Sequence, residues 1–374
     1  MASHKTLAAV AYSGETDFRL EHIEIEAPRA DEVLIEIKGV GICHTDLVFR
    51  SGNIPYPFPA VFGHEGSGIV QAVGNKVSKV NVGDHVLVTF RSCGDCSRCK
   101  LDDAAYCQNM LLLNAIGSRE DGSSALSNKD GSVASNFFGQ SSFAAHAITY
   151  ERNLVKVDKQ LPIEILGPLG CSVQTGAGSV MRSLAAHPRS SILIAGGGSV
   201  GLCAVMGAVI QQCSSIIVLE PMQGRRELAK ELGATHCIDP NAVEDSVKAI
   251  LEIAPQGVDN ALDTTALAPV QKVLFDSLGS KGTLGLVGIG AEDFPLPCTV
   301  NDLFAGGKSV KAIVEGDSDP DSFLPELVKH FEAGRLPIER LITRYKLSEI
   351  NQAIADQHSG ASIKAVLIPD KFSD

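Results

Sequence analysis

The sequence ILIAGGGSVGLCAVMGAVI, at residues 192–210, joins an apolar strand-like segment to a helix-like one through a run of glycines. The glycines follow the pattern G-x-G-x-x-G as Gly196, Gly198 and Gly201. Between a strand and a helix, the first permits a tight turn, the second lets the backbone approach a pyrophosphate, and the third allows close packing. The amino end of the helix also favours phosphate. The stretch therefore predicts a dinucleotide-binding site.

An acidic residue stands where such a site needs one. Glu220 ends the run IIVLE, roughly 20 residues beyond the glycines. Its carboxylate can accept both hydroxyls of the adenosine ribose and would repel a 2′-phosphate, which favours NAD over NADP. Arg225, a further candidate for cofactor binding, and Arg226 follow closely and weaken that preference.

The surrounding pattern extends the prediction to a whole domain. From about residue 190 onward, short apolar runs alternate with helix-like segments, which is typical of a doubly wound parallel sheet. The first third of the chain is β-rich, with turn residues between strand-like runs at 6–12, 32–40, 68–73 and 85–89. We therefore expect an α/β protein of two domains, which also suits a length of 374 residues.

The composition of the chain excludes some classes of binding partner. A net charge of -12 argues against nucleic acid and against an anionic membrane surface. No export signal is visible, no apolar run is long enough to span a bilayer, and the chain has ten cysteines. We therefore expect reduced thiols and a cytoplasmic location.

A cysteine cluster indicates a metal site. Cys93, Cys96, Cys99 and Cys107 form a C-x2-C-x2-C-x7-C pattern within one short segment. A tetrahedral zinc needs four thiolates that converge, and closely spaced cysteines on turns supply them at little entropic cost. Disulfides are the alternative, but nothing in the chain indicates an oxidising compartment. The cluster predicts a structural zinc.

A second group of metal-binding residue types is dispersed. Cys43 and His44 lie in GICHTD, His64 and Glu65 lie in GHEG, and Cys171 follows much later. Only the fold could bring them together, so spacing leaves this site open. A lone cysteine such as Cys171 is often a small core residue.

Four motifs in order resemble one family over almost the whole chain. GICHTD at 41–46, GHEGSGIVQAVG at 63–74, the cysteine cluster and GGGSVG at 196–201 are similar to those of zinc-containing alcohol dehydrogenases of the medium-chain dehydrogenase/reductase family. CHTDLV and residues 54–59 most resemble the aryl (benzyl) alcohol dehydrogenase branch. The glutathione-dependent formaldehyde dehydrogenases, which act on S-(hydroxymethyl)glutathione, share CHTD and are the nearest competing branch.

The resemblance implies a domain plan. A GroES-like catalytic domain with a structural zinc lobe would comprise residues 1–172 and 315–374, and a Rossmann NAD-binding domain would comprise residues 173–314. The active site is expected in the cleft between them. The run at 310–314 lies where family members pair sheet edges between subunits, which implies a homodimer or homotetramer.

The resemblance also implies a catalytic zinc, and hence two zinc ions per chain. Cys43, His64 and Cys171 would hold it, Glu65 would be an alternative ligand, and Asp46 would orient His64. Zinc would make the alcohol hydroxyl acidic, and the alkoxide would pass a hydride to NAD. Thr45 would pass the proton toward the cofactor ribose. Val48 replaces the histidine that completes this relay in liver-type enzymes, so the last proton step is left open.

The remaining cofactor positions are carried over in the same way. His44 and Lys364 would contact the phosphates. Thr175 and Val200 would flank the nicotinamide ring. Val287 would meet the carboxamide through its backbone.

Aromatic residues suggest the substrate. Phe90, Phe137, Phe138 and Ile54 match positions that line the family's substrate channel, and aromatic walls suit flat apolar alcohols. The alternative is that the phenylalanines are core residues. Benzylic, cinnamylic or allylic primary alcohols, or their aldehydes, are the expected substrates, with small aliphatic alcohols or a polyol as the alternatives. No cationic anchor for a glutathione adduct is identified, and the intact ligand set argues against a non-catalytic nucleotide-binding protein.

Overall fold

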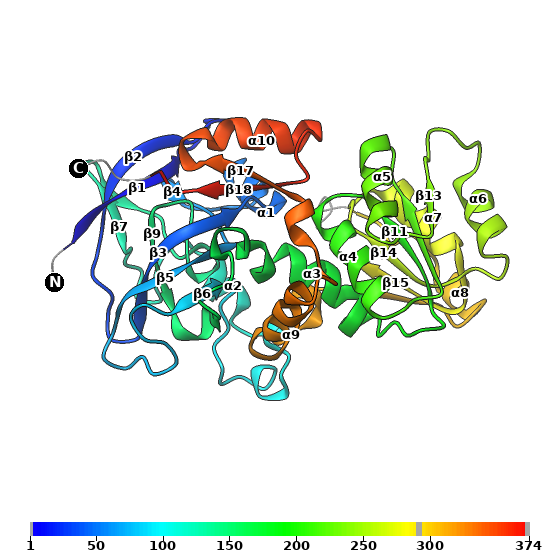
Figure 1. Ribbon diagram of the computed structural model, residues 1–374, viewed down its shortest axis with the longest axis horizontal. Helices are drawn as coiled ribbons and strands as arrows, with labels where there is room; N and C mark the ends of the chain where they lie inside the picture. The colour runs from blue at the N-terminus through cyan, green and yellow to red at the C-terminus, as the bar shows by residue number, and fades with distance from the viewer. Residues whose placement is uncertain (1–2, 289–293, 371–374) are drawn as a thin grey trace. The chain divides into compact units, whose positions relative to one another are not determined.

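A computed structural model describes residues 3–288 and 294–370. The chain groups into two compact units, shown in Figure 1. The first unit comprises Met1–Cys171, Asp319–Lys329 and Pro337–Asp374, and the second comprises Ser172–Ser318 and His330–Leu336. Compared with the expected division, Ser172 and residues 315–318 and 330–336 group with the nucleotide-binding part.

The first unit is built on two sheets. One has the strand order β4 (Ala60–Val61), β1 (His4–Ala11), β2 (Arg19–Ile25), β7 (Leu126–Asn128) and β8 (Gly131–Val133). The other has the order β10 (Leu154–Val157), β6 (His85–Val88), β5 (Gly66–Val73), β3 (Glu32–Gly41), β18 (Lys364–Ile368) and β17 (Ile342–Lys346), with β9 (His146–Tyr150) also on β3.

Strand β3 organises the second of these sheets. Its sequence EVLIEIKGVG is rich in β-branched residues and is buried along most of its length. One edge pairs with β5, and the other pairs with β9 and then with β18. Because Val366 pairs with Gly41, the C-terminal strand lies beside the segment that leads into the GICHTD motif (Figure 1).

The second unit contains a six-stranded sheet whose neighbouring strands are all parallel. Its order is β13 (His236–Ile238), β12 (Ser215–Leu219), β11 (Ser191–Ala195), β14 (Val258–Asp263), β15 (Leu278–Leu286) and β16 (Ser309–Ala312). Counted from β11 this is 3-2-1-4-5-6, the order of dinucleotide-binding sheets. The predicted doubly wound sheet is confirmed.

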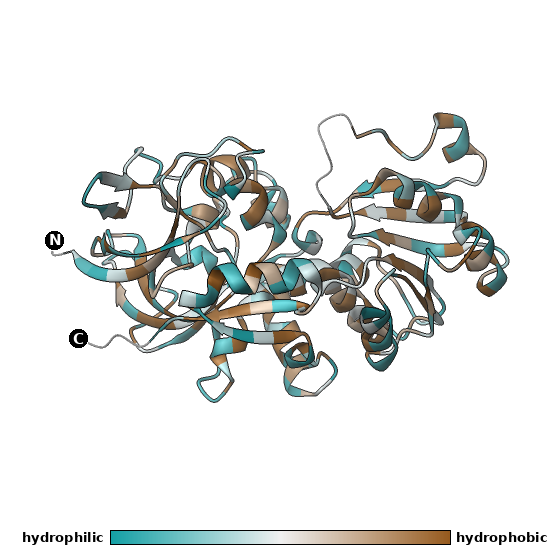
Figure 2. Ribbon diagram, turned by 90° about the horizontal axis from the view of Figure 1, so that it is seen from above, coloured by the Kyte–Doolittle hydropathy of each residue, from teal (hydrophilic) through white to brown (hydrophobic). Residues whose placement is uncertain are grey.

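Burial follows the sequence pattern in both units. Strands β11 and β12 are buried at four of their five positions, as continuous apolar runs predict. Figure 2 shows hydrophobic residues, in brown, recurring along the strands of each unit. The helices are α1 (His44–Arg50), α2 (Met110–Asn114), α3 (Ser172–Gly178), α4 (Ser199–Ile210), α5 (Gln223–Glu231), α6 (Ser246–Ile253), α7 (Ala268–Asp276), α8 (Val300–Phe304), α9 (Pro320–Glu332) and α10 (Ile350–Ser359). Within the described ranges, none of them has the length and hydropathy needed to cross a bilayer.

Candidate functional site

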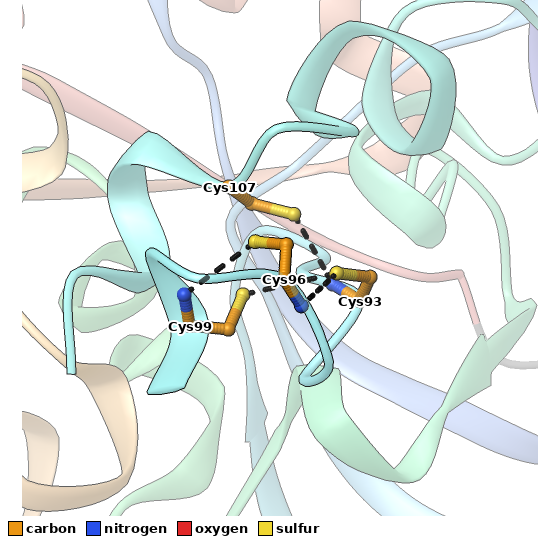
Figure 3. Close-up of side chains that lie close together, drawn as sticks. All are labelled: Cys93, Cys96, Cys99 and Cys107. Atoms are coloured by element: carbon orange, nitrogen blue, oxygen red, sulfur yellow. Dashed lines mark hydrogen bonds between the residues drawn. The ribbon is translucent and has the colours of Figure 1, made fainter. Parts of the chain in front are cut away.

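The four clustered cysteines converge. Their Sγ atoms all lie within 4.8 Å of one another, and Figure 3 shows the thiols pointing toward a common centre. All four are free thiols, with Cys93 Sγ 4.0 Å from Cys99 Sγ. The geometry thus favours the metal-site interpretation over the disulfide alternative.

Backbone groups prepare this cluster for thiolates. The amides of Cys96, Cys99 and Cys93 donate to the sulfurs of Cys93 (3.4 Å), Cys96 (3.5 Å) and Cys107 (3.3 Å), respectively. Such donors stabilise the charged form of a thiol. The backbone hydrogen bond from Cys99, together with that from Gln108, lowers the pKa of Cys96 to about 6. Burial has the opposite effect on two of the thiols, raising the pKa of Cys99 to about 12 and also raising the pKa of Cys107. The set of four convergent sulfur donors fits a zinc ion.

The dispersed group also converges. Cys43, His64, Glu65 and Cys171 each offer a ligand atom, and these atoms lie within 4.8 Å of one another. Cys43 is the residue that precedes α1, His64 and Glu65 connect β4 to β5, and Cys171 follows a 3-10 turn. This resolves the question that spacing left open, because the sheet edges and turns of one unit deliver all four side chains.

Asp46 fixes the orientation of this group. Its Oδ1 accepts a hydrogen bond from Gly63 N (3.0 Å) and lies 2.9 Å from His64 Nδ1, while Oδ2 accepts from Cys43 N (2.9 Å). Asp46 has no exposed surface. Its carboxylate therefore joins the segments that carry Cys43 and His64.

His64 supplies a direct test of metal fit. With Nδ1 engaged by Asp46, its Nε2 is buried and has no hydrogen-bond partner in the described part of the chain. A buried polar nitrogen without a partner is costly, and a ligand ion would satisfy it. The residues present fit a zinc held by two thiolates and an imidazole.

The charges of the site favour a cation. The hydrogen bond with Cys171 and the nearby His64 and Lys364 hold the pKa of Cys43 well below its usual range, despite burial. Burial lowers the pKa of His64, but the negative charges of Asp46 and Cys43 raise it by more. Anionic groups thus outweigh desolvation around this imidazole.

Glu65 is paired rather than turned to solvent. Its Oε2 lies 2.5 Å from Lys364 Nζ, which also donates to Ile42 O at 2.9 Å. Burial raises the pKa of Glu65 against the opposing effect of Lys364, and Glu65 raises the pKa of Lys364 against burial. A Cβ at Gly41 would lie 2.0 Å from this carboxylate, so glycine leaves it room. In this structure Lys364 forms an ion pair with Glu65. The contact of Lys364 with a cofactor phosphate stays a prediction.

His44 and Thr45 are the first two residues of α1 and follow Cys43 directly. His44 is exposed, and Thr45 is half-buried with its Oγ1 3.8 Å from Cys43 Sγ. Thr45 is thus close enough to the metal group to contact a molecule bound there.

The predicted pocket residues divide into two pairs. Phe90 and Phe137 are 2% and 0% exposed, so both are core residues. Neither has surface that a substrate could contact. Phe138 and Ile54 are half-buried against the same core. Phe138 stacks on the His64 ring, with centroids 4.5 Å apart at 27°. Of the four predicted pocket residues, Phe138 is therefore the one that combines partial exposure with a contact to a residue of the metal group.

Two neighbours of this site were not predicted. Gln140 donates from Nε2 to His64 O (2.9 Å) and accepts from Gly66 N (3.1 Å), so it holds the loop of two ligand residues. Tyr56 packs edge-on against Phe137 and Phe49, and burial raises its pKa. Gln140 carries no motif signal. Tyr56 lies within residues 54–59, the stretch that resembles the aryl alcohol dehydrogenase branch, so that resemblance could have identified Tyr56 as a neighbour of the site.

The glycine-rich turn has the predicted geometry. Gly196 has φ +96°, and a Cβ at Gly201 would lie 1.9 Å from Gly196 O. A Cβ at Gly198, by contrast, would meet nothing within 4 Å. Protein packing therefore requires the first and third glycines, whereas the space at Gly198 suits a ligand approaching the amino end of α4.

Glu220 sits against this turn. Its Oε2 accepts from Gly197 N (2.5 Å) and its Oε1 from Met222 N (2.8 Å). Arg226 binds Glu220 O (2.8 Å) and Asp239 (3.0 Å). Arg225 Nε is buried and has no hydrogen-bond partner among the described residues. The Glu220 carboxylate is thus held at the turn by backbone amides. Of the two arginines, Arg226 is bound to Glu220 O and to Asp239.

The predicted nicotinamide residues lie on adjoining helices. Thr175 is in α3 and Val200 is in α4, and a Cβ at Gly176 would lie 2.2 Å from Val200 O. Val287 follows β15 and donates its amide to Asp263 O at 3.1 Å.

Comparisons with known proteins agree with this architecture. Residues 29–159 match the alcohol dehydrogenase GroES-like domain, and residues 199–332 match the zinc-binding dehydrogenase domain. Geraniol dehydrogenase of Castellaniella defragrans is 46% identical, over 93% of this chain and 94% of that protein.

Solved structures agree as well. A Burkholderia ambifaria alcohol dehydrogenase zinc-binding domain protein has a TM-score of 0.96 and 44% identity, over 99% of this chain and 100% of that chain. Benzyl alcohol dehydrogenase of Acinetobacter calcoaceticus has a TM-score of 0.94 and 40% identity, over 98% and 100%. S-(hydroxymethyl)glutathione dehydrogenase of Saccharomyces cerevisiae is only 30% identical, over 98% and 97%.

The fold, the two ligand groups and these similarities define a zinc-binding oxidoreductase with a nicotinamide cofactor. The chain belongs to the zinc-binding alcohol dehydrogenases of the medium-chain dehydrogenase/reductase family.

Proposed function

We propose that this chain is an NAD-dependent dehydrogenase that interconverts aromatic or allylic primary alcohols and their aldehydes, with a catalytic and a structural zinc. The convergence of Cys43, His64 and Cys171, with Phe138 stacked on His64, is the observation that carries the proposal. A zinc ion bound there supplies Lewis acidity, which makes an alcohol hydroxyl acidic and polarises an aldehyde carbonyl.

The chain's own residues then have separate tasks. Asp46 holds His64 at Nδ1, which would leave Nε2 available to bind the metal ion. Thr45, whose Oγ1 lies 3.8 Å from Cys43 Sγ, would receive the hydroxyl proton and pass it toward the cofactor ribose. The GroES-like unit supplies the metal ligands and the Rossmann unit supplies the cofactor site.

Support for NAD comes from Glu220. Its carboxylate is fixed at the glycine-rich turn by the amides of Gly197 and Met222, where a 2′-phosphate would meet negative charge. His44 and Lys364 are proposed phosphate contacts, Thr175 and Val200 flank the nicotinamide, and Val287 meets its carboxamide.

Support for the substrate class comes from the pocket and the relatives. Phe138 offers an aromatic face near the metal group, and Ile54 adds apolar surface. Geraniol is an allylic alcohol and benzyl alcohol an aromatic one, and both appear in the names of relatives with at least 40% identity.

A homodimer or homotetramer is also proposed. Strand β16 is the last strand in the order of its sheet, and the nearby Val300 and Phe304 are 68% and 81% exposed. A second copy pairing at β16 would cover this edge. Light scattering during size exclusion measures the state directly.

An initial-rate assay tests the proposal. Benzyl alcohol, cinnamyl alcohol and ethanol are each offered with NAD or NADP, and S-(hydroxymethyl)glutathione is offered in parallel. We expect rapid benzylic and cinnamylic turnover with NAD, loss of activity on chelation, and two zinc ions per chain. Turnover of the glutathione adduct alone would identify the formaldehyde-type branch instead. Two bound zinc ions without turnover of any alcohol would refute the substrate class.

A further inference from the structure

The turn Glu315–Asp317 has an unusual backbone. Glu315, Gly316 and Asp317 have φ values of 49°, 70° and 51°, so the left-handed region is occupied three times in succession. Two of these residues carry side chains, for which this region is unfavourable. Such conformations persist where surrounding contacts enforce them, and they are concentrated at functional sites.

The contacts of Glu315 run to helix α3. Its Oε2 accepts a hydrogen bond from Gln174 Nε2 at 3.1 Å and from Thr175 Oγ1 at 3.3 Å. Gln174, Thr175 and Glu315 are 0%, 7% and 9% exposed. A buried carboxylate therefore holds the hydroxyl of the residue that is proposed to flank the nicotinamide.

The backbone of the turn approaches the same helix. A Cβ at Gly316 would lie 2.3 Å from Gln174 O, so only glycine permits this approach. Ser318 Oγ donates to Glu315 O at 2.8 Å and also lies 3.4 Å from Gln174 Oε1. The turn is thus fitted closely to the segment of α3 that contains Thr175.

Asp317 anchors the turn independently. It accepts a hydrogen bond from Ser183 Oγ at 2.6 Å and forms an ion pair with Lys311 at 2.6 Å. Asp317 therefore attaches the turn at a second point, through contacts separate from those of Glu315 with Gln174 and Thr175.

Holding the Thr175 hydroxyl sets the direction of its methyl group. Threonine has two branches at Cβ, so fixing Oγ1 fixes the rotamer and with it the methyl. Thr175 and Val200 lie on helices in close contact at Gly176, so the orientation of Thr175 shapes the surface that both present.

We infer that Glu315 is a positioning residue for the nicotinamide ring, acting through Thr175. The inference rests on the proposed function, because it takes from there that Thr175 flanks this ring. It predicts that Glu315 affects the nicotinamide half of the cofactor and not the adenosine half.

Comparing NADH with ADP-ribose, which lacks the nicotinamide, tests this. Zinc-loaded full-length parent, Glu315→Ala and Glu315→Gln proteins are titrated with each ligand by fluorescence or calorimetry. For Glu315→Ala we expect the Kd of NADH to rise roughly tenfold, equivalent to about 1.4 kcal/mol, while the Kd of ADP-ribose stays within about twofold. Glu315→Gln should recover much of the loss, because its amide oxygen can accept from Thr175.

Two further variants separate positioning from folding. Asp317→Asn, in the same turn, should not discriminate between the two ligands. Thr175→Val removes the hydroxyl at nearly constant volume, so its effect on NADH should not add to that of Glu315→Ala.

The outcomes are distinct. Equal weakening of NADH and ADP-ribose, or no change in either, would overturn the inference while the parent's activity leaves the proposed function intact. A parent protein that binds neither ligand would refute the proposed function, and the inference with it. If Glu315→Ala does not fold, Thr175→Val, which removes the hydroxyl that Glu315 holds, decides alone, and equal weakening of NADH and ADP-ribose by that variant would overturn the inference.

Discussion

Lys364 and Glu65 form an ion pair with side chains that are 2% and 0% exposed, and their Nζ and Oε2 atoms are 2.5 Å apart. The pair joins the C-terminal strand β18 to the loop that carries His64. It also places a positive charge beside the residues that would hold the catalytic zinc. The last strand of the chain thereby contributes to the electrostatics of a site assembled mainly from its first half.

Removal of Lys364 should destabilise the protein strongly. Lys364→Met leaves the Glu65 carboxylate buried without its counter-ion, which costs about 3–5 kcal/mol in unfolding free energy. Chemical denaturation of the zinc-loaded protein measures the change. The double variant Glu65→Gln/Lys364→Met is the control and should regain most of the loss, whereas a loss below about 1 kcal/mol for Lys364→Met would contradict the prediction.

That loss should depend on pH in a definite direction. Burial already raises the pKa of Glu65, and removal of Lys364 raises it further. A group whose folded-state pKa is raised favours folding most when it is protonated, so the variant gains stability relative to the parent as pH falls. Denaturation at pH 8 and pH 5 should therefore show a smaller difference between the two proteins at pH 5.

Asp46→Asn should weaken the catalytic metal site without unfolding the protein. An amide in place of the carboxylate holds His64 less firmly and lowers its basicity, and changes of this kind cost about 10–100-fold in metal affinity or activity. Competition with a chelator, followed by metal analysis, gives the affinity. Asp121→Asn, at an exposed ion pair with Arg29, is the matched control and should match the parent.

The glycines of the turn should separate binding from folding. A Cβ at Gly198 would meet no protein atom within 4 Å, so the stability of Gly198→Ala should stay within about 0.5 kcal/mol of the parent while NAD affinity falls at least about tenfold. Gly201→Ala places a Cβ 1.9 Å from Gly196 O and should lose about 1–3 kcal/mol of stability. Thermal unfolding and NADH titration of both variants check this, and equal stability losses would contradict it.

The cysteine cluster should be structural. Cys96→Ser is expected to reduce the zinc content from two ions per chain to one and to lower the unfolding free energy by roughly 3 kcal/mol. Turnover at low temperature should persist, because these cysteines lie outside the group around Cys43. Cys213→Ser controls for loss of a thiol elsewhere. A protein that keeps both metal ions would show that Cys96 is not a ligand.

Thr45 should carry the proton. Thr45→Ala is expected to reduce kcat by roughly 10²–10⁴-fold, the usual contribution of a proton-transfer group, with the zinc content unchanged. Thr45→Ser retains the hydroxyl and should restore most of the rate. An alanine variant as fast as the parent would remove Thr45 from the mechanism.

Local patterns determined much of this protein in advance. The glycine-rich turn at Gly196 and Gly201 and the alternation of apolar strand-like runs with helix-like segments after it predicted the parallel sheet. The prediction was possible because strand, turn and helix are contiguous there, so their periodicity can be read from neighbouring residues. The cluster from Cys93 to Cys107 could be predicted for the same reason, since short loops close at little entropic cost.

Contacts between distant segments were decided by tertiary structure alone. Cys43, His64 and Cys171 could be proposed as one site only through family resemblance, because sheet pairing and 3-10 turns far apart in the chain bring their atoms together. Gln140, which holds the His64 loop, had no local signal at all.

The same holds for the roles of individual side chains. Residue type alone could not separate Phe137, enclosed by other aromatic rings, from Phe138, stacked on His64 beside the metal group. Nor could it show that Lys364 pairs with Glu65, or that Glu315 holds Thr175. Sequence periodicity reports which face of an element is buried, whereas the partner on that face is chosen by the packing of elements remote in the chain.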